Sequence, residues 1–364
     1  MDGGYAMEKG RLTALFKPDG VYTRHSEGAF LRMKDGALMF AYSRFTGAWF
    51  DDAPSDIVFC VSRDEGETWT EPDVMLSAAS FGVKNIMSLS LLRMENGDLG
   101  AICIAKEPPQ IYRVYLSRSA DEGKTFYKRI DCLENVGQGH YVVNNARVIR
   151  LKSGRLILPL AHHRSDGRAK SGENAHIDYR ASGVWVYSDD DGESWLPADD
   201  IVFPPFTGSK TGLQEPGVIE KQSGALWGFY RTDMGFQYET FSMDGGLHWT
   251  AAQPSRFTSP VSPMSMARHA SGRLYAVWNP IPEYNGRAKS SAGWGRTPLV
   301  MAHSDDDGAS WSEPEIIEEE EGHGYCYTAL FFTRDNALLA AYCSGGPEEG
   351  ACLARLSIRK IELE

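Results

Sequence analysis

One eight-residue pattern, Ser-x-Asp-x-Gly-x-x-aromatic, occurs five times in this 364-residue chain and constrains its fold more than any other feature. In each copy the Asp side chain can accept hydrogen bonds from backbone N–H groups about two residues on. The Gly supplies the turn position that needs positive φ, and the aromatic residue begins the returning strand. The pattern therefore predicts five tight β-hairpin turns, at residues 62–69, 119–126, 188–195, 242–249 and 304–311.

These turns recur at intervals of 57, 69, 54 and 62 residues, a period typical of repeat architectures. The competing interpretation is a calcium-binding loop, because several copies contain three acidic residues. An Asp-x-Asp-x-Asp-Gly loop ending on Asp191 would need an acid at position 187, which is Tyr187. We therefore interpret the turns as structural elements of one domain that spans residues 1–364.

A second repeat lies between these turns: an apolar strand, a tight turn that usually contains glycine, and another apolar strand. A third strand ending in Ser follows each copy, and the Asp-containing turn leads into a fourth. The sixth unit lacks that turn, with its third strand expected at Leu353–Ser357, so we expect Arg11–Phe16 to supply its missing strand. Six four-stranded units predict an all-β fold, a six-bladed β-propeller. The six hairpins span residues 29–42, 89–104, 146–160, 216–230, 264–278 and 328–342.

Composition narrows the classes of partner and compartment. A formal charge of −12 and a pI near 5.3 disfavour nucleic acid and anionic membranes as partners. Residues 1–7 lack the basic and apolar regions of a secretory signal, so we expect a cytoplasmic protein unless a leader has been removed. The six cysteines show no Cys-x-x-Cys spacing and are expected to be reduced core thiols.

The innermost strand of each propeller blade begins beside the central channel, so equivalent residues there should meet in one pocket. In each blade, the residue expected to reach this pocket lies nine positions before the central residue of the hairpin turn. Polar side chains at five of the six positions indicate either a binding pocket or hydrogen bonding around a water-filled channel. The six residues are Glu27, Ser88, Asn145, Glu215, Pro263 and Tyr327.

With these turns and this ring of residues, the chain resembles the sialidase (neuraminidase) superfamily, which carries such Asp-boxes (BNR repeats) on a six-bladed propeller. Glu215-Pro-Gly-Val-Ile-Glu, followed by Arg231, resembles the segment of a catalytic Glu and an Arg that binds the substrate carboxylate. Tyr327-Thr-Ala-Leu-Phe-Phe resembles the segment that opens with the tyrosine nucleophile. Arg296 resembles the third carboxylate-binding arginine. The resemblance implies a retaining exo-glycoside hydrolase that removes a terminal acidic sugar, sialic acid first.

The chemistry of this pairing follows from acidity. A phenol with a pKa near 10 is about three units too weakly acidic to attack at neutral pH, so Tyr327 needs a base, and Glu215 can take its proton. A carboxylic acid must protonate the leaving oxygen. The loop at residues 44–56 resembles the acid/base loop of the superfamily, and we favour Asp52, with Asp51 as the alternative and Arg44 as a substrate contact.

The resemblance fails at the first arginine of the carboxylate site, where Ser26, Glu27 and Gly28 stand instead. Arg24 lies close enough along the strand to replace it, although Glu27 would change the charge of the pocket. His140 and His162 flank the third inner strand and its partner. We assign them, with Asn145, to substrate hydroxyls and expect no metal or cofactor, because no carboxylate cluster or ligand spacing accompanies them.

Two other functions stay open. A polysaccharide lyase would use Tyr and His residues to abstract the proton α to a uronate carboxylate, and an unsaturated product would identify it. A glycan-binding propeller without catalysis would bind a sugar tightly and release no product. In all three cases the partner is a glycan.

Overall fold

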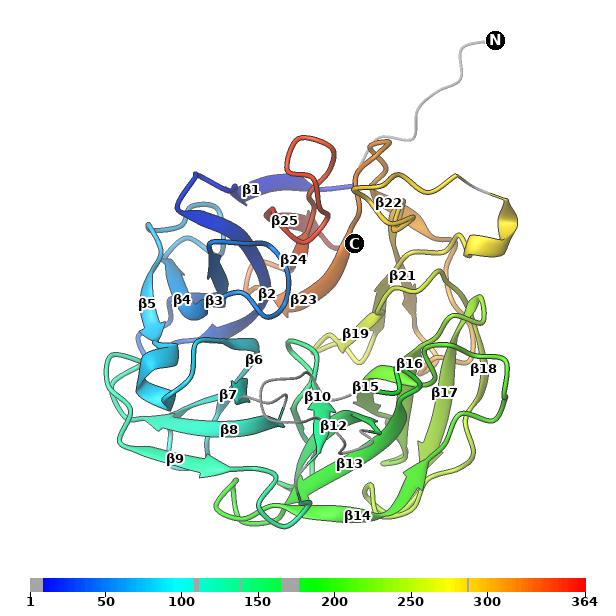
Figure 1. The fold of residues 1–364 in the computed structure, drawn as a ribbon, viewed down its shortest axis with the longest axis horizontal. Coiled ribbons are helices and arrows are strands. Elements are labelled where there is room, and N and C mark those ends of the chain that lie inside the picture. The colour runs from blue at the N-terminus through cyan, green and yellow to red at the C-terminus, as the bar shows by residue number, and fades with distance from the viewer. Residues whose placement is uncertain (1–8, 108–110, 138, 165–176, 287) are drawn as a thin grey trace.

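The computed structural model describes residues 9–107, 111–137, 139–164, 177–286 and 288–364, in which six antiparallel sheets form a closed ring (Figure 1). The protein is an all-β, six-bladed propeller. Blade 1 contains β2 (Tyr22–Arg32), β3 (Leu38–Thr46), β4 (Ser55–Ser62) and β5 (Asp73–Leu76). Blade 2 contains β6 (Ile86–Arg93), β7 (Leu99–Glu107), β8 (Ile111–Ser119) and β9 (Lys128–Asp131). Blade 3 contains β10 (His140–Val142), β11 (Ile149–Arg150), β12 (Leu156–His163), β13 (Ser182–Ser188) and β14 (Leu196–Val202).

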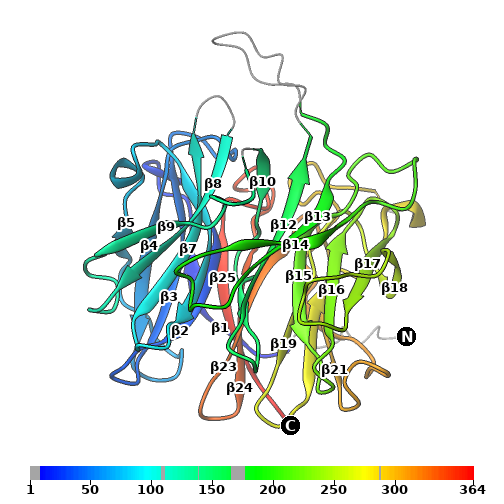
Figure 2. The same ribbon diagram turned by 90° about the horizontal axis from the view of Figure 1, so that it is seen from below.

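The remaining three blades complete the ring, which Figure 2 shows from the side. Blade 4 contains β15 (Gln214–Glu220), β16 (Leu226–Arg231), β17 (Phe236–Ser242) and β18 (Gln253–Thr258). Blade 5 contains β19 (Ser265–Arg268), β20 (Leu274–Trp278), β21 (Leu299–Ser304) and β22 (Glu315–Glu318). Blade 6 contains β23 (Cys326–Phe332), β24 (Ala337–Cys343), β25 (Leu356–Glu362) and β1 (Arg11–Phe16). The helices of the described residues are two short 3-10 turns, η1 (Ala78–Phe81) and η2 (Glu283–Asn285).

The N-terminal strand closes the ring as predicted, because β1 pairs antiparallel with β25, Phe16 opposite Leu356. The expected third strand of this blade, Leu353–Ser357, is wrong in its bounds. β25 begins at Leu356 and continues through Ser357 to Glu362, since no Asp-box follows Ser357 to turn the chain. Residues 1–7, on which the prediction about a leader depends, lie outside the described residues.

The Asp-boxes form the predicted turns. In the third copy Ser188 Oγ donates to Asp190 Oδ1 over 2.8 Å, and the Ser194 backbone N–H donates to the same oxygen over 2.9 Å. The Gly192 N–H donates to Ser188 Oγ over 2.8 Å, and Trp195 Nε1 donates to the Gly192 carbonyl over 3.1 Å. The Ser, Asp and Trp side chains of the pattern therefore bond within their own turn, whereas Asp189 and Asp191 between them pair with arginines outside the turn.

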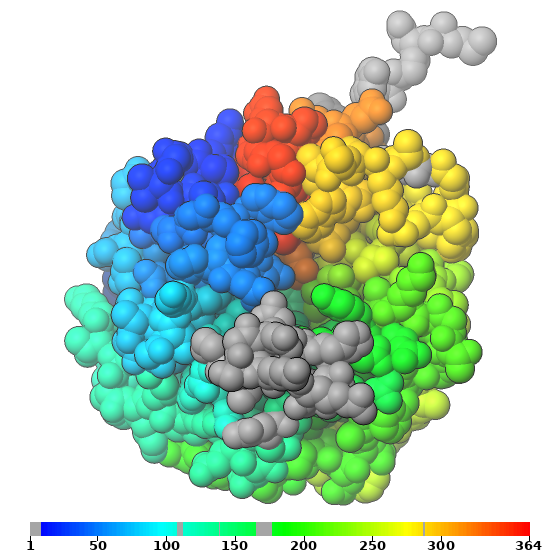
Figure 3. Space-filling model, in the orientation of Figure 1, coloured from blue at the N-terminus to red at the C-terminus, as the bar shows by residue number. Residues whose placement is uncertain are grey.

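Apolar faces of adjacent blades pack together and form the core. One cluster joins blades 3 and 4, where the indoles of Trp185 and Trp249 stack with 3.8 Å between ring centroids. Equivalent clusters fill the other junctions, so each blade buries its face only against its neighbours. Figure 3 shows successive parts of the chain following one another around one face of the molecule. All six cysteines are free and buried in this core. Over the described chain, no helix is long and apolar enough to cross a membrane.

Candidate active site

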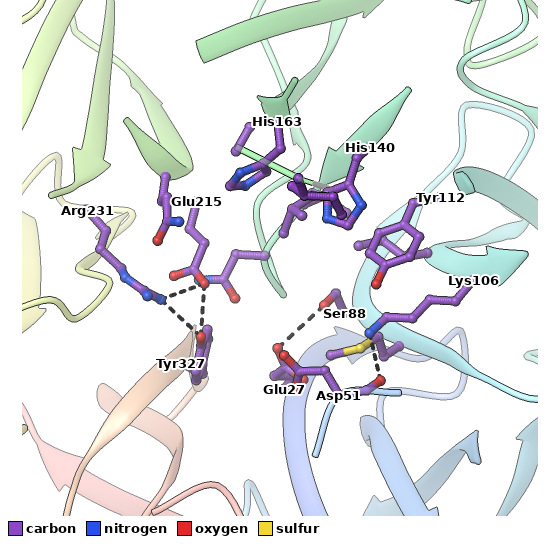
Figure 4. Close-up of a pocket in the computed structure, with 18 of the residues that line it drawn as sticks. Glu27, Asp51, Ser88, Lys106, Tyr112, His140, His163, Glu215, Arg231 and Tyr327 are labelled. Carbon is purple, nitrogen blue, oxygen red and sulfur yellow. Dashed lines mark hydrogen bonds and ion pairs between the residues drawn. The ribbon is translucent and has the colours of Figure 1, made fainter. Parts of the chain in front are cut away.

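A cavity of about 350 Å³ opens near the ring axis, lined by residues of blades 1, 2, 3, 4 and 6 and of the loops between them (Figure 4). Its described charged lining consists of four carboxylates and two cations. The carboxylates are Glu27, Asp51, Asp52 and Glu215, and the cations are Lys106 and Arg231. Tyr112, His140, His163, Tyr179 and Tyr327 also line it.

A repeated backbone distortion brings the inner-strand residues to this cavity. Glu27, Ser88, Glu215 and Tyr327 each have positive φ, between 47° and 58°, although none is glycine. At each of them the strand pairing shifts register, as in a β-bulge. Non-glycine residues rarely adopt this conformation, and four Asp-box residues, of which Asp191 is one, share it. What distinguishes the inner-strand positions is that all four side chains line one cavity.

The two other predicted ring positions lie differently. In blade 3 the positive φ falls on Ala146, and the buried Asn145 points between blades. Its amide donates to the backbone carbonyls of Gly28, at 2.7 Å, and Tyr327, at 3.1 Å. Asn145 therefore joins three blades and does not line the cavity. Pro263 precedes β19 and is also absent from the lining.

Glu215 and Tyr327 meet inside the cavity, as expected from their equivalent places on two inner strands. The Tyr327 hydroxyl donates to Glu215 Oε1 over 2.9 Å. Arg231 Nη1 donates to the same carboxylate oxygen at 2.7 Å and to the Tyr327 oxygen at 3.2 Å. Glu215 Oε2 is buried and has no hydrogen-bond partner in the described structure. The side chains converge from three strands on one point (Figure 4).

The protonation of Tyr327 fits a phenol that gives up its proton only during attack. Burial, and then the negative charge of Glu215, raise the pKa of Tyr327 well above its ordinary value, against the opposing charges of Arg231 and Arg296. Tyr327 therefore rests as a neutral hydrogen-bond donor. Glu215 Oε1 accepts the hydrogen bond of this hydroxyl.

The predicted acid/base loop lies on the opposite wall of the cavity, where Figure 4 shows Asp51 beside Lys106 and away from Glu215. Lys106 Nζ lies 2.6 Å from the Asp51 carbonyl and 3.4 Å from Asp52 Oδ1. The Tyr112 hydroxyl donates to Asp52 Oδ1 over 3.3 Å. The Asp52 side chain is 68% exposed, so it can reach a leaving group and exchange protons with solvent.

Arg24 does not reach the cavity surface in this structure. Its side chain is buried, and all three guanidinium nitrogens are occupied by protein groups. Nη2 donates to Glu27 Oε2 at 2.8 Å, Nη1 to Asp51 Oδ1 at 2.5 Å, and Nε to Ser26 Oγ at 2.7 Å. The carboxylate of Glu27, and not the guanidinium of Arg24, therefore lines the cavity.

The two carboxylates that share Arg24 titrate differently. Burial is the main cause that raises the pKa of Glu27 to about 7, with Asp51 and Glu215 adding to it and Arg24 opposing it. Desolvation also acts on Asp51, but the charges of Arg24 and Lys106 outweigh it and lower the pKa of Asp51. One guanidinium thus holds one carboxylate ionised and leaves the other near its midpoint at neutral pH.

Arg296 also has protein partners. It lies between two aromatic rings, with its guanidinium carbon 5.2 Å from the centroid of Trp294 and 5.5 Å from that of Tyr327. Nη1 lies 3.0 Å from Cys326 Sγ, and Nε donates to the Val261 carbonyl at 3.2 Å. Arg296 lines a neighbouring depression with Trp294 and not the cavity that holds Glu215.

Two other predicted substrate contacts do not line the cavity. Arg44 lies over the ring of Tyr22, 3.8 Å from its centroid. His162 packs on Tyr141 with 4.8 Å between ring centroids, whereas His163, the next residue, lines the cavity beside His140. Successive side chains of a strand point to opposite faces, so the prediction chose the wrong one of two adjacent histidines.

Lys106 and Tyr112 were not anticipated as site residues. They end β7 and begin β8, the places in blade 2 that correspond to the acid/base loop in blade 1. Blade equivalence, applied to loops as well as to inner strands, could have found them. Across the described ranges, no three His, Cys, Asp or Glu side chains are arranged to hold a metal ion.

Comparison with known proteins places the chain in a family. The model of the BNR repeat-like domain matches residues 42–341. A protein of unknown function from Dyadobacter fermentans superposes with a TM-score of 0.71 at 18% identity, over 100% of both chains. The intramolecular trans-sialidase from Ruminococcus gnavus, in complex with oseltamivir carboxylate, gives 0.69 at 13% identity over 99% of both chains.

The NanB sialidase from Streptococcus pneumoniae gives 0.71 at 12% identity, over 98% of this chain and 71% of that one. A comparison with curated protein sequences gives no significant match. At these identities the solved structures share the fold, and the family model covers most of the chain. The chain belongs to the BNR repeat-like domain family, and its six-bladed propeller is that of the sialidases.

Proposed function

We propose that the protein is a retaining exo-glycoside hydrolase with Tyr327 as nucleophile, Glu215 as its base and Asp52 as acid/base. The observation that carries this proposal is the 2.9 Å hydrogen bond from the Tyr327 hydroxyl to Glu215 inside a cavity. Both residues occupy strained backbone positions. A buried phenol bonded to a carboxylate is the arrangement that nucleophilic attack with general-base assistance needs.

In the first step the Tyr327 oxygen bonds to the anomeric carbon and its proton passes to Glu215 Oε1. The bond from that carbon to the leaving oxygen breaks, and Asp52 gives its proton to that oxygen. In the second step Asp52 takes a proton from water as the water oxygen attacks the same carbon. The Tyr327–carbon bond then breaks, and the phenol recovers its proton from Glu215. Two inversions give net retention.

Arg231 stabilises both partners of this pair. Its Nη1 lies 2.7 Å from Glu215 and 3.2 Å from the Tyr327 oxygen, so it offsets negative charge that develops on either oxygen. The likeness to sialidases makes a terminal acidic sugar, sialic acid first, the starting candidate for the substrate. That candidate needs a carboxylate site, to which Arg231 contributes but Arg24 and Arg296 do not in this structure.

The proposal is tested with a panel of aryl glycosides, acidic and uncharged, and the Tyr327→Phe variant. We expect release of the aryl alcohol by the wild type, a product that first appears with the anomeric configuration of the substrate, and no turnover by the variant. A fully active Tyr327→Phe variant would rule the assignment out.

A polysaccharide lyase is the second candidate, favoured by the histidines and tyrosine on the blade 2 and 3 side of the cavity. The ring centroids of Tyr112 and His140 lie 4.2 Å apart, and those of His140 and His163 lie 5.3 Å apart. Uronate polymers separate the two reactions, because a lyase gives an unsaturated product that absorbs in the ultraviolet and a hydrolase does not.

A further inference from the structure

We infer that this cavity selects a terminal sugar without a carboxylate, and that Glu27 is the residue that sets this specificity. The inference rests on the proposed function for the site. It concerns the charge of the sugar, for which the likeness to sialidases suggests an acidic sugar instead. Its first ground is the described charged lining, in which carboxylates outnumber cations by four to two.

Each of the three arginines predicted to bind a substrate carboxylate has at least one partner within the protein. Arg24 is held by Glu27 and Asp51, at 2.8 and 2.5 Å. Arg231 Nη1 is held by Glu215 at 2.7 Å, while the buried Nε of Arg231 has no hydrogen-bond partner among the described residues. Arg296 lies 3.0 Å from Cys326 Sγ. A substrate carboxylate would have to compete with these internal partners. Packing already holds the partners in place, whereas the substrate loses entropy when it binds.

The engagement of Arg296 is supported by the state of its sulfur partner. Burial alone would raise the pKa of the Cys326 thiol. Hydrogen bonds from Cys343 and Cys352, together with the charge of Arg296, outweigh burial and lower the pKa of Cys326 well below its ordinary value. The 3.0 Å contact between Arg296 Nη1 and Cys326 Sγ therefore favours the ionised form of this thiol.

Glu27 places a buried carboxylate at the cavity surface, where it opposes the binding of a second carboxylate. It is 4% exposed, and it faces the cavity near Tyr327 (Figure 4). Among the described residues, its Oε1 accepts a hydrogen bond from the Ser88 hydroxyl alone, at 3.5 Å, which leaves acceptor capacity for a sugar hydroxyl. When Glu27 is ionised, its buried carboxylate repels a second carboxylate more strongly than an exposed one would. Glu27 therefore favours hydroxyl donors and opposes a carboxylate.

A tyrosine nucleophile is compatible with an uncharged sugar. A carboxylate in its place would add a fifth negative charge to the lining, beside Glu215. The phenol of Tyr327 is neutral until it attacks, so it avoids that repulsion whatever the charge of the substrate. The acidic lining of this cavity therefore favours a neutral phenol over a carboxylate as the nucleophile.

The test uses a matched pair of probes, the methylumbelliferyl α-glycoside of N-acetylneuraminic acid and the methyl ester of the same compound, which lacks the negative charge. Uncharged methylumbelliferyl galactoside, N-acetylglucosaminide and fucoside complete the panel. Binding is measured by saturation-transfer NMR and titration on the Tyr327→Phe variant, with and without Glu27→Gln. Glu313→Gln, an exposed change of the same kind, is the control.

We expect at least one uncharged probe to bind at least tenfold more tightly than the acid. Glu27→Gln should lower the ratio of the two dissociation constants, acid over uncharged probe, by about tenfold. Glu313→Gln should leave this ratio unchanged. Binding of the acid as tight as that of every uncharged probe overturns the inference. Failure of all uncharged probes to bind also overturns it, whatever the acid does.

Turnover by the wild type separates this inference from the proposed function. Preferred binding of uncharged probes without any hydrolysis keeps the inference and rejects the hydrolase. Hydrolysis of the acid with a kcat/KM at least equal to that of its ester keeps the hydrolase and rejects the inference.

Discussion

The Asp-box turns and the inner-strand starts both repeat around the ring, yet they differ in what is repeated. In the boxes the side chains repeat, and Asp190 spends its hydrogen bonds on Ser188 and Ser194 of its own turn. At the inner-strand starts Glu27, Ser88, Glu215 and Tyr327 share a positive φ, as the Asp-box residues Asp191 and Asp307 also do, but the side chains at the strand starts differ and line one cavity. A repeated side chain with local partners marks a structural element. A repeated distortion that presents different side chains to one cavity marks a site.

The largest expected effect is the loss of activity in Tyr327→Phe. Removing the nucleophilic oxygen should lower kcat by about 10³-fold or more, because no other group in the described lining is placed to replace it. The melting temperature should stay close to that of the wild type. Steady-state kinetics on the best glycoside of the panel check this, with the exposed Tyr284→Phe as the control. Equal losses of activity in Tyr327→Phe and Tyr284→Phe would contradict the assignment of the inner-strand starts as the site.

Glu215→Gln should be the next most damaging change. The amide keeps the shape of the side chain but cannot take the phenol proton, so kcat should fall by about 10²- to 10⁴-fold. Glu220→Gln lies on the same strand β15, outside the cavity, and should retain activity. If both variants hydrolyse the substrate at similar rates, the base has been assigned to the wrong residue.

An Asp-box change should show the reverse behaviour. Asp190→Ala removes three hydrogen bonds of one turn and should lower the free energy of unfolding by about 2 kcal/mol, with little effect on kcat/KM. Urea denaturation and kinetics measure the two quantities. Asp189→Ala, the neighbour whose exposed carboxylate pairs with Arg155, should cost less. A large loss of activity in Asp190→Ala at unchanged stability would break the distinction between box and site.

The smallest expected effect is a pH dependence of stability caused by Glu27. Its pKa is raised from 4.5 to about 7 in the folded protein, so the native state binds a proton that the unfolded state has already lost between these values. Its contribution to stability is therefore full below pH 4.5 and falls as pH rises to about 7. Glu27→Gln should flatten this part of the stability curve, because the amide binds no proton. Denaturation curves of both proteins across that range test it, and parallel curves would contradict the raised pKa.

Most of the fold was predictable because its determinants are local. The Asp-boxes and the hairpins each specify a turn within a few residues, and counting them gives the number of blades. The pairing of β1 with β25 followed from the missing strand of the sixth unit. The bounds of β25 were wrong because the absence of an Asp-box after Ser357 lets a strand continue, and the expected strand assumed the same length as in the other blades.

Blade equivalence predicted part of the site. It also selected Asn145 and Pro263, which do not line the cavity, while the resemblance supplied Asp51, Asp52 and Arg231, which do. Glu215 and Tyr327 were placed together because both start inner strands. The engagement of Arg24 by Glu27 and Asp51 depends on rotamers and loop packing, which sequence spacing does not give. A shift of one residue decided between His162 and His163, because a strand alternates its faces.

The central claim is that Tyr327 carries the sugar between the two steps, and detection of that intermediate tests it most directly. The Asp52→Ala variant lacks the base for the second step. Dinitrophenyl glycosides need no acid for the first, so the intermediate should accumulate. After an acid quench, peptide mapping by mass spectrometry should find the mass of the sugar on the peptide that contains Tyr327, and not in an Asp52→Ala, Tyr327→Phe double variant. Release of dinitrophenol with no sugar on that peptide, or with the sugar on another residue, would contradict the account.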